Sequence, residues 1–330
     1  MSLPGPPAGT LLLTRADCER LLTWETGLEA VRGAFVAMAT GEAQAFSTIR
    51  EPLPGGYFGL RSATWPARGL VGLKASGFLL SNRERGLDSH QAVVALLDPE
   101  SGRTRALVDG NHVTWLRTAL AGLAGTLALS RSDARHVLVV GNGLQAEAQV
   151  RSHAWGLADR QPTFAVHAPR DGADGAKAAA FVARAAVHGI PVEAAPDLRD
   201  ALASADVVIT ATPAAAPIVP GAWVAPGTHL SAMGADAPGK RELDDDLVAR
   251  CGLFADDRDQ SIRFGEGRSL RAGDELPTLG EVLAGLVPGR RAETEITVFD
   301  STGLGLHDVV VADAACRLAL EAGVGTWFAF

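Results

Sequence analysis

The sequence HVLVVGNGLQA occupies residues 136–146. It contains four consecutive apolar residues, Val137 to Val140, of which three are β-branched, and this predicts a strand that is buried on both faces. The strand leads into a Gly-x-Gly-x-x-Ala turn and then into a helical pattern. This order predicts a dinucleotide-binding unit, in which Gly141 makes the tight turn, Gly143 lets the backbone approach a pyrophosphate and Ala146 permits close packing. A glycine turn in another kind of α/β protein is the alternative.

Strand and helix patterns alternate after residue 137, and strands separated by such helices predict parallel βαβ units. The further predicted strands are residues 163–167, 191–194, 206–210, 228–233, 253–255 and 296–299, and the predicted helices are residues 173–188, 197–204 and 307–322. The fold class that we expect is therefore α/β, with a doubly wound Rossmann sheet.

Upstream of this region, residues 46–115 have β-like patterns. The candidate strands are residues 10–14, 57–60, 69–74, 92–97 and 104–108. One candidate helix begins after Thr14, and two others cover residues 25–39 and 114–129. We expect a Rossmann domain over residues 119–303. A smaller α+β domain is expected from residues 1–118 together with residues 304–330, because the last helix can cross back to the first domain.

The composition excludes several classes of protein. The net charge is −8 and no run of Lys and Arg occurs, which argues against nucleic-acid binding. The three cysteines are far apart, so neither a disulfide framework nor a metal site is expected, and a reducing cytoplasm is the expected compartment. Neither a signal peptide nor a run of about 18 apolar residues is present, so we expect no membrane association.

Isolated cations in apolar surroundings are the first candidates for chemistry. Arg50, Lys74 and Arg117 each follow an apolar segment. A single cation of this kind is usually a surface residue with a buried stem. If all three meet in one cleft, the arginines can clamp a carboxylate, and a partly desolvated lysine can exchange a proton with a substrate nitrogen.

Two loops supply further candidates. His90 and Gln91 are predicted to lie in a loop before a strand, where they either complete a turn or contact a polar group of the substrate. Asp236 follows a predicted strand in a glycine-bounded loop, where open α/β sheets bind ligands. It is either a turn aspartate or a carboxylate directed at a substrate amine. Residues 244–246 are all Asp and predict a helix N-terminus rather than a metal site.

Six segments in this order resemble motifs of the ornithine cyclodeaminase/μ-crystallin family, over nearly the whole chain. They are residues 72–74, 97–102, 113–119, 141–146, 233–243 and 300–308. The resemblance implies a two-domain NAD(P) protein that is usually a homodimer through its N-terminal domain. It also implies that Arg50, Lys74 and Arg117 face the substrate, and that Asp236 approaches the substrate nitrogen.

The resemblance further implies the residues that line the cofactor. They are Arg117, Thr118, Gly141, Asn142, Gly143, Leu144, Gln145, Ala168, Arg170, Thr210, Ala211, Thr212, Met233, Gly234, Ala235, Ser301 and Gly303. The choice between NAD and NADP stays open, because Arg170 suits a 2′-phosphate whereas Asp171 suits a ribose hydroxyl.

The expected activity is hydride transfer to the imine carbon of a small α-imino acid, either iminosuccinate-like or a cyclic ketimine, or the reverse dehydrogenation. Residues 81–92 are similar to the iminosuccinate reductase branch of the family. An additional cation at the pocket, from Arg61, Arg83 or Arg85, favours a dicarboxylate. The alternatives are a cyclodeaminase that recycles NAD and a non-catalytic NADP-binding protein like μ-crystallin; the presence of Lys74, Arg117 and Asp236 argues against the latter.

Overall fold

The computed structural model of the chain describes residues 9–169, 171, 175–271 and 273–329. The chain divides into two compact units. Unit 1 consists of Met1–Arg117 and Leu304–Phe330, and unit 2 of Thr118–Gly303. Helix α3 (Gly110–Leu129) begins in unit 1 and ends in unit 2.

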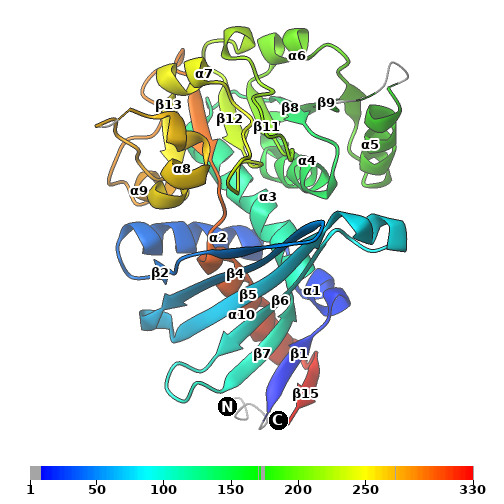
Figure 1. The fold of residues 1–330 in the computed structure, drawn as a ribbon, viewed down its shortest axis with the longest axis vertical. Coiled ribbons are helices and arrows are strands. Elements are labelled where there is room, and N and C mark those ends of the chain that lie inside the picture. The colour runs from blue at the N-terminus through cyan, green and yellow to red at the C-terminus, as the bar shows by residue number, and fades with distance from the viewer. Residues whose placement is uncertain (1–8, 170, 172–174, 272, 330) are drawn as a thin grey trace. The chain divides into compact units, whose positions relative to one another are not determined.

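Unit 1 is built on an eight-stranded sheet with the order β15-β1-β7-β6-β5-β4-β2, and β3 pairs with β4 (Figure 1). The pairs are antiparallel except β1 with β7. The strands are β1 (Thr10–Leu13), β2 (Gln44–Ala45), β3 (Ile49–Leu53), β4 (Gly56–Trp65), β5 (Leu70–Leu79), β6 (His90–Leu97), β7 (Thr104–Asp109) and β15 (Thr326–Phe328). The helices are α1 (Arg15–Leu21), α2 (Trp24–Ala39) and α10 (Gly305–Ala322).

Helix α10 packs on strands β4, β5 and β6 and against α2 (Figure 1). Side chains alternate along a strand, so every second residue of these strands faces the helix. Ala63, Leu70 and Val94 lie on this face and are buried. Helix α10 is itself buried from Gly305 to Cys316, and a charged side chain in this part of it is therefore shielded from water.

Unit 2 has a seven-stranded parallel sheet with the order β10-β9-β8-β11-β12-β14-β13. The strands are β8 (His136–Val140), β9 (Thr163–His167), β10 (Val192–Ala194), β11 (Val207–Thr210), β12 (His229–Ala232), β13 (Gly252–Ala255) and β14 (Thr297–Asp300). The helices are α4 (Leu144–Gly156), α5 (Ala176–Val187), α6 (Leu198–Ser204), α7 (Asp245–Arg250), α8 (Arg258–Phe264) and α9 (Leu279–Leu283). The order reverses between β8 and β11, as in a Rossmann sheet, and this confirms the predicted fold class.

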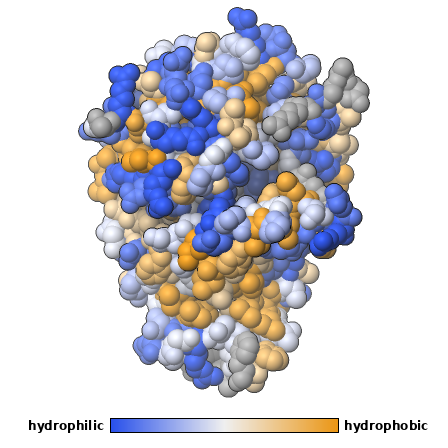
Figure 2. Space-filling view, viewed as in Figure 1, coloured by the Kyte–Doolittle hydropathy of each residue, from blue (hydrophilic) through white to orange (hydrophobic). Residues whose placement is uncertain are grey.

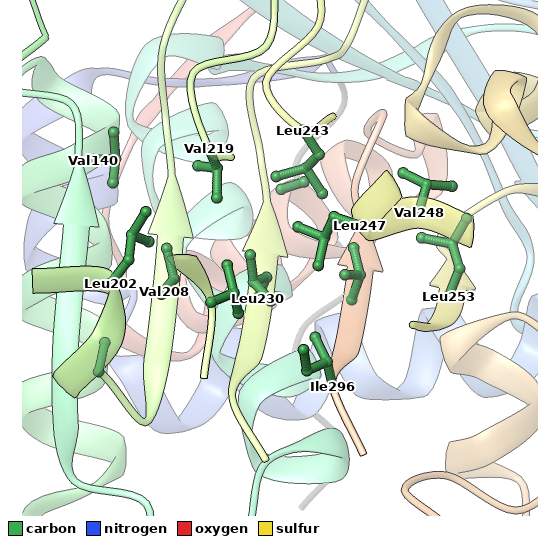
Figure 3. Close-up of a cluster of buried hydrophobic side chains, with 14 of the residues drawn as sticks. Val140, Leu202, Val208, Val219, Leu230, Leu243, Leu247, Val248, Leu253 and Ile296 are labelled. Atoms are coloured by element: carbon green, nitrogen blue, oxygen red, sulfur yellow. The ribbon is translucent and has the colours of Figure 1, made fainter. Parts of the chain in front are cut away.

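One face of the parallel sheet is covered by a continuous apolar core (Figure 3). Val140, Val208 and Leu230 come from three neighbouring strands, and Leu202 and Leu247 meet them from α6 and α7. All five side chains are completely buried. Each contributes about 1.5–3 kcal/mol by leaving water, so this core holds the strand ends in fixed positions.

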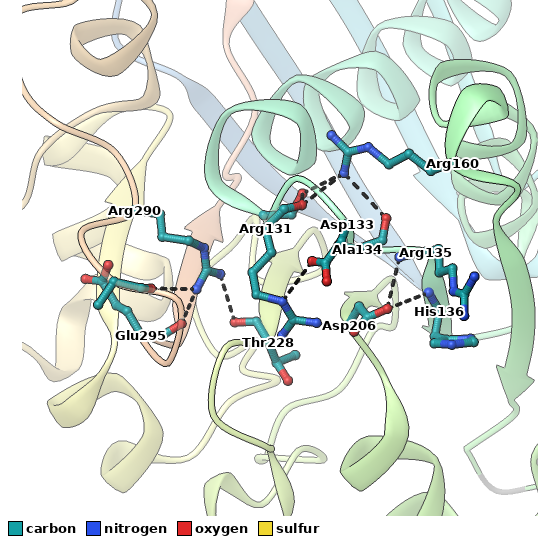
Figure 4. A network of polar contacts seen from close by, with 12 residues as sticks. Arg131, Asp133, Ala134, Arg135, His136, Arg160, Asp206, Thr228, Arg290 and Glu295 are labelled. Carbon is teal, nitrogen blue, oxygen red and sulfur yellow. Dashed lines mark hydrogen bonds and ion pairs between the residues drawn. The ribbon is translucent and has the colours of Figure 1, made fainter.

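The amino ends of β8 and β11 are joined by a polar network around Asp206 (Figure 4). Its carboxylate accepts hydrogen bonds from Arg131 Nη2 at 2.6 Å and from the amides of Arg135 at 3.0 Å and His136 at 2.9 Å. The network therefore stabilises the edge of the sheet opposite to the Gly-x-Gly turn.

Two local predictions were wrong. His90 and Gln91 are the first residues of β6 rather than loop residues, because they pair with Phe78 and Gly77 and extend the β5–β6 hairpin. The helix predicted at residues 114–129 begins four residues earlier, at Gly110, so Arg117 lies inside α3 rather than in its first turn. Among the described residues, no helix is both long enough and apolar enough to cross a membrane.

Candidate functional site

The helix-facing side of the unit 1 sheet carries an unusual pair of cations. Arg61 of β4 is directly opposite Lys74 of β5 in the antiparallel register. The two residues are only 9% and 3% exposed. Like charges in such a pair destabilise a sheet, so packing alone does not explain them.

A single carboxylate oxygen connects Lys74 to helix α3. Lys74 Nζ donates to Asp308 Oδ1 of α10 at 3.0 Å and to Thr114 Oγ1 of α3 at 3.0 Å. Arg117 Nε, also from α3, donates to the same Asp308 Oδ1 at 3.0 Å. Within the described part of the chain, Asp308 Oδ2 is buried and accepts no hydrogen bond. The arrangement brings Lys74 and Arg117 together around an aspartate that the sequence analysis did not select.

The charges in this cluster determine its protonation. Burial lowers the pKa of Lys74 to about 7; Asp308 opposes this shift, whereas the charges of Arg117 and Arg61 add to it. Burial alone would raise the pKa of Asp308, but the charges of Arg117, Lys74 and Arg61 lower it to about 2. Asp308 is therefore ionised at neutral pH, while Lys74 is poised to give up or take a proton.

His90 lies near this cluster, on β6. Burial, together with the charges of Lys74 and Arg117, lowers its pKa to about 4, so its ring is neutral at pH 7. Gln91 pairs with Gly77, and strand alternation therefore directs it to the other face of the sheet from Lys74. Its Oε1 accepts a hydrogen bond from Asn111 Nδ2 at 3.0 Å.

Apart from Arg117 and Arg61, the candidate arginines are Arg50, Arg83 and Arg85. Arg50 is on β3, on the same face as Lys74 by register, and its guanidinium lies 3.9 Å from the ring centre of Tyr57. Arg85 is exposed. The side chain of Arg83 lies outside the described residues. Of the two proposed additional cations whose side chains the structure describes, Arg61 lies beside Lys74.

His307 is a second buried polar residue that the sequence analysis missed. Its ring packs edge-on against Phe35, with 4.4 Å between ring centres. Burial lowers its pKa to about 3, and the charge of Arg117 adds to this shift. A signal was present in the sequence, because the dipeptide His307-Asp308 interrupts an apolar helix, where a charge needs partners.

In unit 2, the turn after β8 has the shape expected for a phosphate cradle. Gly141 has φ +135°, and a Cβ there would lie 2.6 Å from the carbonyl oxygen of Ala211. Gly143 is the N-cap of α4 and makes no side-chain cap, and a Cβ there would have no atom within 4 Å. Open space in front of free helix amides suits a pyrophosphate, so the residues fit a dinucleotide.

Gln145, in the first turn of α4, supports the same conclusion. Its Oε1 is buried, and the described residues provide it with no hydrogen-bond donor. Arg184 of α5 donates to the carbonyl of Asn142 at 2.8 Å and thereby fixes the turn from outside. The sequence analysis did not select Arg184, because its contact depends on how α5 packs.

The remaining predicted cofactor residues lie mainly at the carboxyl ends of strands in unit 2. They are Ala168 after β9, Thr210, Ala211 and Thr212 at the end of β11, Met233, Gly234 and Ala235 after β12, Ser301 and Gly303 after β14, and Thr118 within α3. Arg170 lies outside the described residues. Asp171 accepts hydrogen bonds from the amides of Lys177 and Ala178, at 3.0 and 2.9 Å, and therefore caps α5.

Asp236 also lies in unit 2, in the loop after β12. Its Oδ1 accepts a hydrogen bond from Lys240 Nζ at 2.5 Å, and both side chains are 29% exposed. Its carboxylate is thus accessible at the same edge of the sheet as the dinucleotide turn. No group of three or more His, Cys, Asp or Glu residues in the described ranges is arranged to hold a metal ion.

The chain is similar to several known proteins. The profile of the Ornithine cyclodeaminase/mu-crystallin family matches residues 9–319. Iminosuccinate reductase of Paracoccus denitrificans (strain Pd 1222) is 35% identical over 321 residues, which cover 95% of this chain and 98% of that protein.

Two solved structures have the same fold over almost their whole length. An archaeal alanine dehydrogenase dimer with bound NAD has a TM-score of 0.89 at 32% identity, and the match covers 97% of this chain and 99% of that chain. The Delta(1)-pyrroline-2-carboxylate reductase of Thermococcus litoralis, in complex with NADH and L-proline, has a TM-score of 0.88 at 28% identity. That match covers 97% of this chain and 100% of the other.

Proposed function

The chain belongs to the ornithine cyclodeaminase/mu-crystallin family, and from that premise we propose that it is an NAD(P)H-dependent reductase of a small α-imino acid. The reaction adds a hydride to the carbon of a C=N bond and a proton to its nitrogen, and its reverse is amino-acid dehydrogenation. Bound NAD(P)H supplies the hydride. The observation that carries the proposal is the buried amine of Lys74, with a pKa of about 7, beside Arg61, Arg117 and Asp308.

Lys74 acts as the acid in this proposal. At neutral pH a substantial fraction of its amine is protonated, and it donates that proton to the nitrogen of the imine. Asp308 and Thr114 orient the amine through hydrogen bonds of 3.0 Å. Arg117, with Arg50, binds the α-carboxylate, for which a planar guanidinium is well suited. Asp236 orients the substrate nitrogen.

The position of Arg61 favours a dicarboxylate over a cyclic ketimine as the substrate. Arg61 lies directly opposite Lys74, and Arg117 shares Asp308 with that lysine. A second guanidinium in this cluster can attract the second carboxylate of a dicarboxylic substrate, which a cyclic ketimine with one carboxylate lacks. Iminosuccinate, formed from oxaloacetate and ammonia, is such a dicarboxylic substrate.

Oxidation of NADH and NADPH tests the proposal directly. Oxaloacetate, pyruvate and glyoxylate are each supplied with ammonia or methylamine, and cyclic imines are tested alongside. We expect turnover with one or both cofactors, fastest with oxaloacetate and ammonia, and loss of turnover in folded Lys74→Ala. Full turnover in that variant would refute the role of Lys74.

A second assay separates the reductase from a cyclodeaminase. The protein is incubated with ornithine and catalytic NAD, and proline and ammonia are measured. A reductase consumes its cofactor stoichiometrically and releases neither product, whereas a cyclodeaminase releases both. Release of ammonia without net cofactor consumption would replace the proposed reaction with the lyase reaction.

We also propose that the protein is a homodimer through the face of the unit 1 sheet opposite to α10. By register, Leu60, Leu73, Val93 and Phe58 lie on this face, and Val93 and Phe58 are 41% and 38% exposed. Figure 2 shows apolar side chains gathered over these strands. Light scattering after gel filtration is expected to give the mass of a dimer, and Val93→Glu is expected to give a monomer that still binds NADH. A monomeric wild-type protein would refute this interface.

A further inference from the structure

Unit 2 contains a buried carboxylate that connects two of its loops. Glu242 is completely buried. Its Oε1 accepts hydrogen bonds from the amide and the hydroxyl of Thr212, at 2.8 and 2.7 Å. Its Oε2 accepts hydrogen bonds from Thr210 Oγ1 and the amide of Gly234, both at 2.7 Å. Four donors from the ends of the adjacent strands β11 and β12 therefore converge on one side chain.

These two loops lie where an open parallel sheet binds its ligand. The first loop packs against the dinucleotide turn, because a Cβ on Gly141 would lie 2.6 Å from the carbonyl oxygen of Ala211. The second loop packs against the first, since a Cβ on Gly234 would lie 2.3 Å from the carbonyl oxygen of Thr212. Backbone thus contacts backbone from the turn to Gly234, and a displacement at one loop is transmitted to the next.

Further carboxylates hold Glu242 itself in place. Its amide donates to Glu266 Oε1 at 2.8 Å, and the amide of Glu266 donates to Asp300 Oδ2 at 2.8 Å, at the end of β14. Asp256 then accepts hydrogen bonds from the amide of Gly303, at 2.6 Å, and from Ser301 Oγ, at 3.2 Å. Acidic side chains therefore fix the loops that follow β11, β12 and β14.

From this geometry we propose that Glu242 is a positioning residue for the dinucleotide site, which acts through the backbone of Thr212 and Gly234. The role rests on the proposed use of NAD(P)H by this protein. Each carboxylate oxygen accepts a hydrogen bond from a backbone N–H. Unlike a hydroxyl group, a backbone N–H can only donate. Both oxygens of a carboxyl group have lone pairs for these amides, whereas a glutamine at this position places its NH2 group against one of them.

Glu266 provides a matched control. Its Oε1 accepts the amides of Glu242 and Leu243, whereas its Oε2 has no hydrogen-bond donor among the described residues. Glutamine therefore fits at Glu266, with its oxygen towards the amides. The two Glu→Gln substitutions make the same chemical change in neighbouring buried side chains, but only the one at Glu242 places an NH2 group against a backbone N–H.

The test is NADH binding to the full-length protein without substrate, measured by fluorescence titration. We expect Glu242→Gln to raise the Kd for NADH by about 10- to 100-fold, because a buried amide loses its acceptor, and Glu266→Gln to leave the Kd within about twofold. Circular dichroism confirms that both variants are folded. A folded Glu242→Gln protein with the wild-type Kd, or an equal loss of affinity in both variants, would overturn the proposal.

Thr210 provides the test if Glu242→Gln does not fold. Thr210 is completely buried, and its hydroxyl donates to Glu242 Oε2. Thr210→Val removes this donor and is expected to weaken NADH binding by about 3- to 10-fold, and Thr210→Ser is expected to retain the affinity. Equal affinities in these two variants would overturn the role of Glu242. Wild-type protein that binds neither NADH nor NADPH would instead overturn the proposed function and this role with it.

Discussion

Replacing Asp308 by asparagine tests whether this aspartate sets the protonation of Lys74. The Lys74 ammonium and Asp308 Oδ1 are 3.0 Å apart and both residues are buried. With an effective dielectric constant of about 20, two unit charges at this distance attract each other by about 5 kcal/mol, which equals roughly 4 pKa units. Water entering the site and the remaining amide oxygen reduce the loss, so we expect the pKa of Lys74 to fall by at least about 1 unit.

The direction of the effect on activity follows from the role of Lys74 as an acid. Its pKa is about 7, so the protonated form predominates below that pH and is lost as the pH rises through it. A lower pKa moves this loss of activity to lower pH. The protonated fraction of Lys74 in Asp308→Asn can be divided by that in the wild type. This ratio is about 1 well below both pKa values, and well above them it is about tenfold lower for each unit of pKa shift.

The assay is the ratio of kcat/KM for Asp308→Asn to that for wild type, measured from about pH 5 to pH 8.5 with oxaloacetate and ammonia. The ratio cancels the pH dependence of imine formation, because both proteins meet the same substrate. Asp313→Asn is the control, since Asp313 is a buried carboxylate of the same helix that pairs with Arg317 instead. We expect its ratio to be independent of pH. A ratio for Asp308→Asn that is equally flat would refute the argument.

Three further substitutions test separate parts of the structure. Arg61→Met is expected to lower kcat/KM for oxaloacetate with ammonia by about 10- to 100-fold and to leave kcat/KM for pyruvate with ammonia unchanged. Equal losses for both substrates would contradict the role of Arg61 in binding a second carboxylate. Gly141→Ala forces a Cβ to 2.6 Å from a carbonyl oxygen, so it is expected to abolish most NADH binding in titrations, and an unchanged Kd would show that the turn is not the cradle. The third substitution is Glu266→Gln. Burial raises the pKa of Glu266 from 4.5 to about 7, so between these pH values the folded protein retains a proton that the unfolded chain has released. The free energy of unfolding of the wild type therefore falls by about 3 kcal/mol as the pH rises from 4.5 to about 7. Urea titrations of Glu266→Gln are expected to match wild type near pH 4 and to give the more stable protein near pH 8, whereas a parallel pH dependence of the two proteins would exclude this titration.

Much of unit 2 could be predicted from local sequence. The structure confirms the buried strand and the glycine turn at residues 137–146, the helix predicted at residues 197–204 and the helix N-terminus predicted at residues 244–246. Each of these signals involves residues within a few positions of one another, so propensity and hydrophobic period are enough to find it. The family resemblance and the expectation of an NAD(P)-dependent oxidoreductase for imino acids are likewise confirmed by the relatives.

The wrong assignments have a common cause. His90 and Gln91 were expected in a loop, because they are polar and precede the apolar run at residues 92–97. Their pairing with β5 makes them part of strand β6. Strands β3 and β15 were not anticipated, since their hydrogen-bond partners lie on other segments. Strand pairing is non-local, and a short polar or mixed segment shows no sign of its partner.

The candidate site was likewise predictable in part from local sequence and in part only from the fold. Sequence was sufficient for the residue types: a lysine and arginines in apolar segments, and glycines where a backbone must approach a phosphate. Folding was needed to bring Asp308 to Lys74, 234 positions earlier in the chain, and to place Arg61 opposite that lysine. The pKa of Lys74 depends on burial and on charges at a few ångströms, and both are properties of packed elements rather than of neighbours in sequence. The same reason applies to Glu242, whose four hydrogen bonds exist only where strands β11 and β12 end side by side.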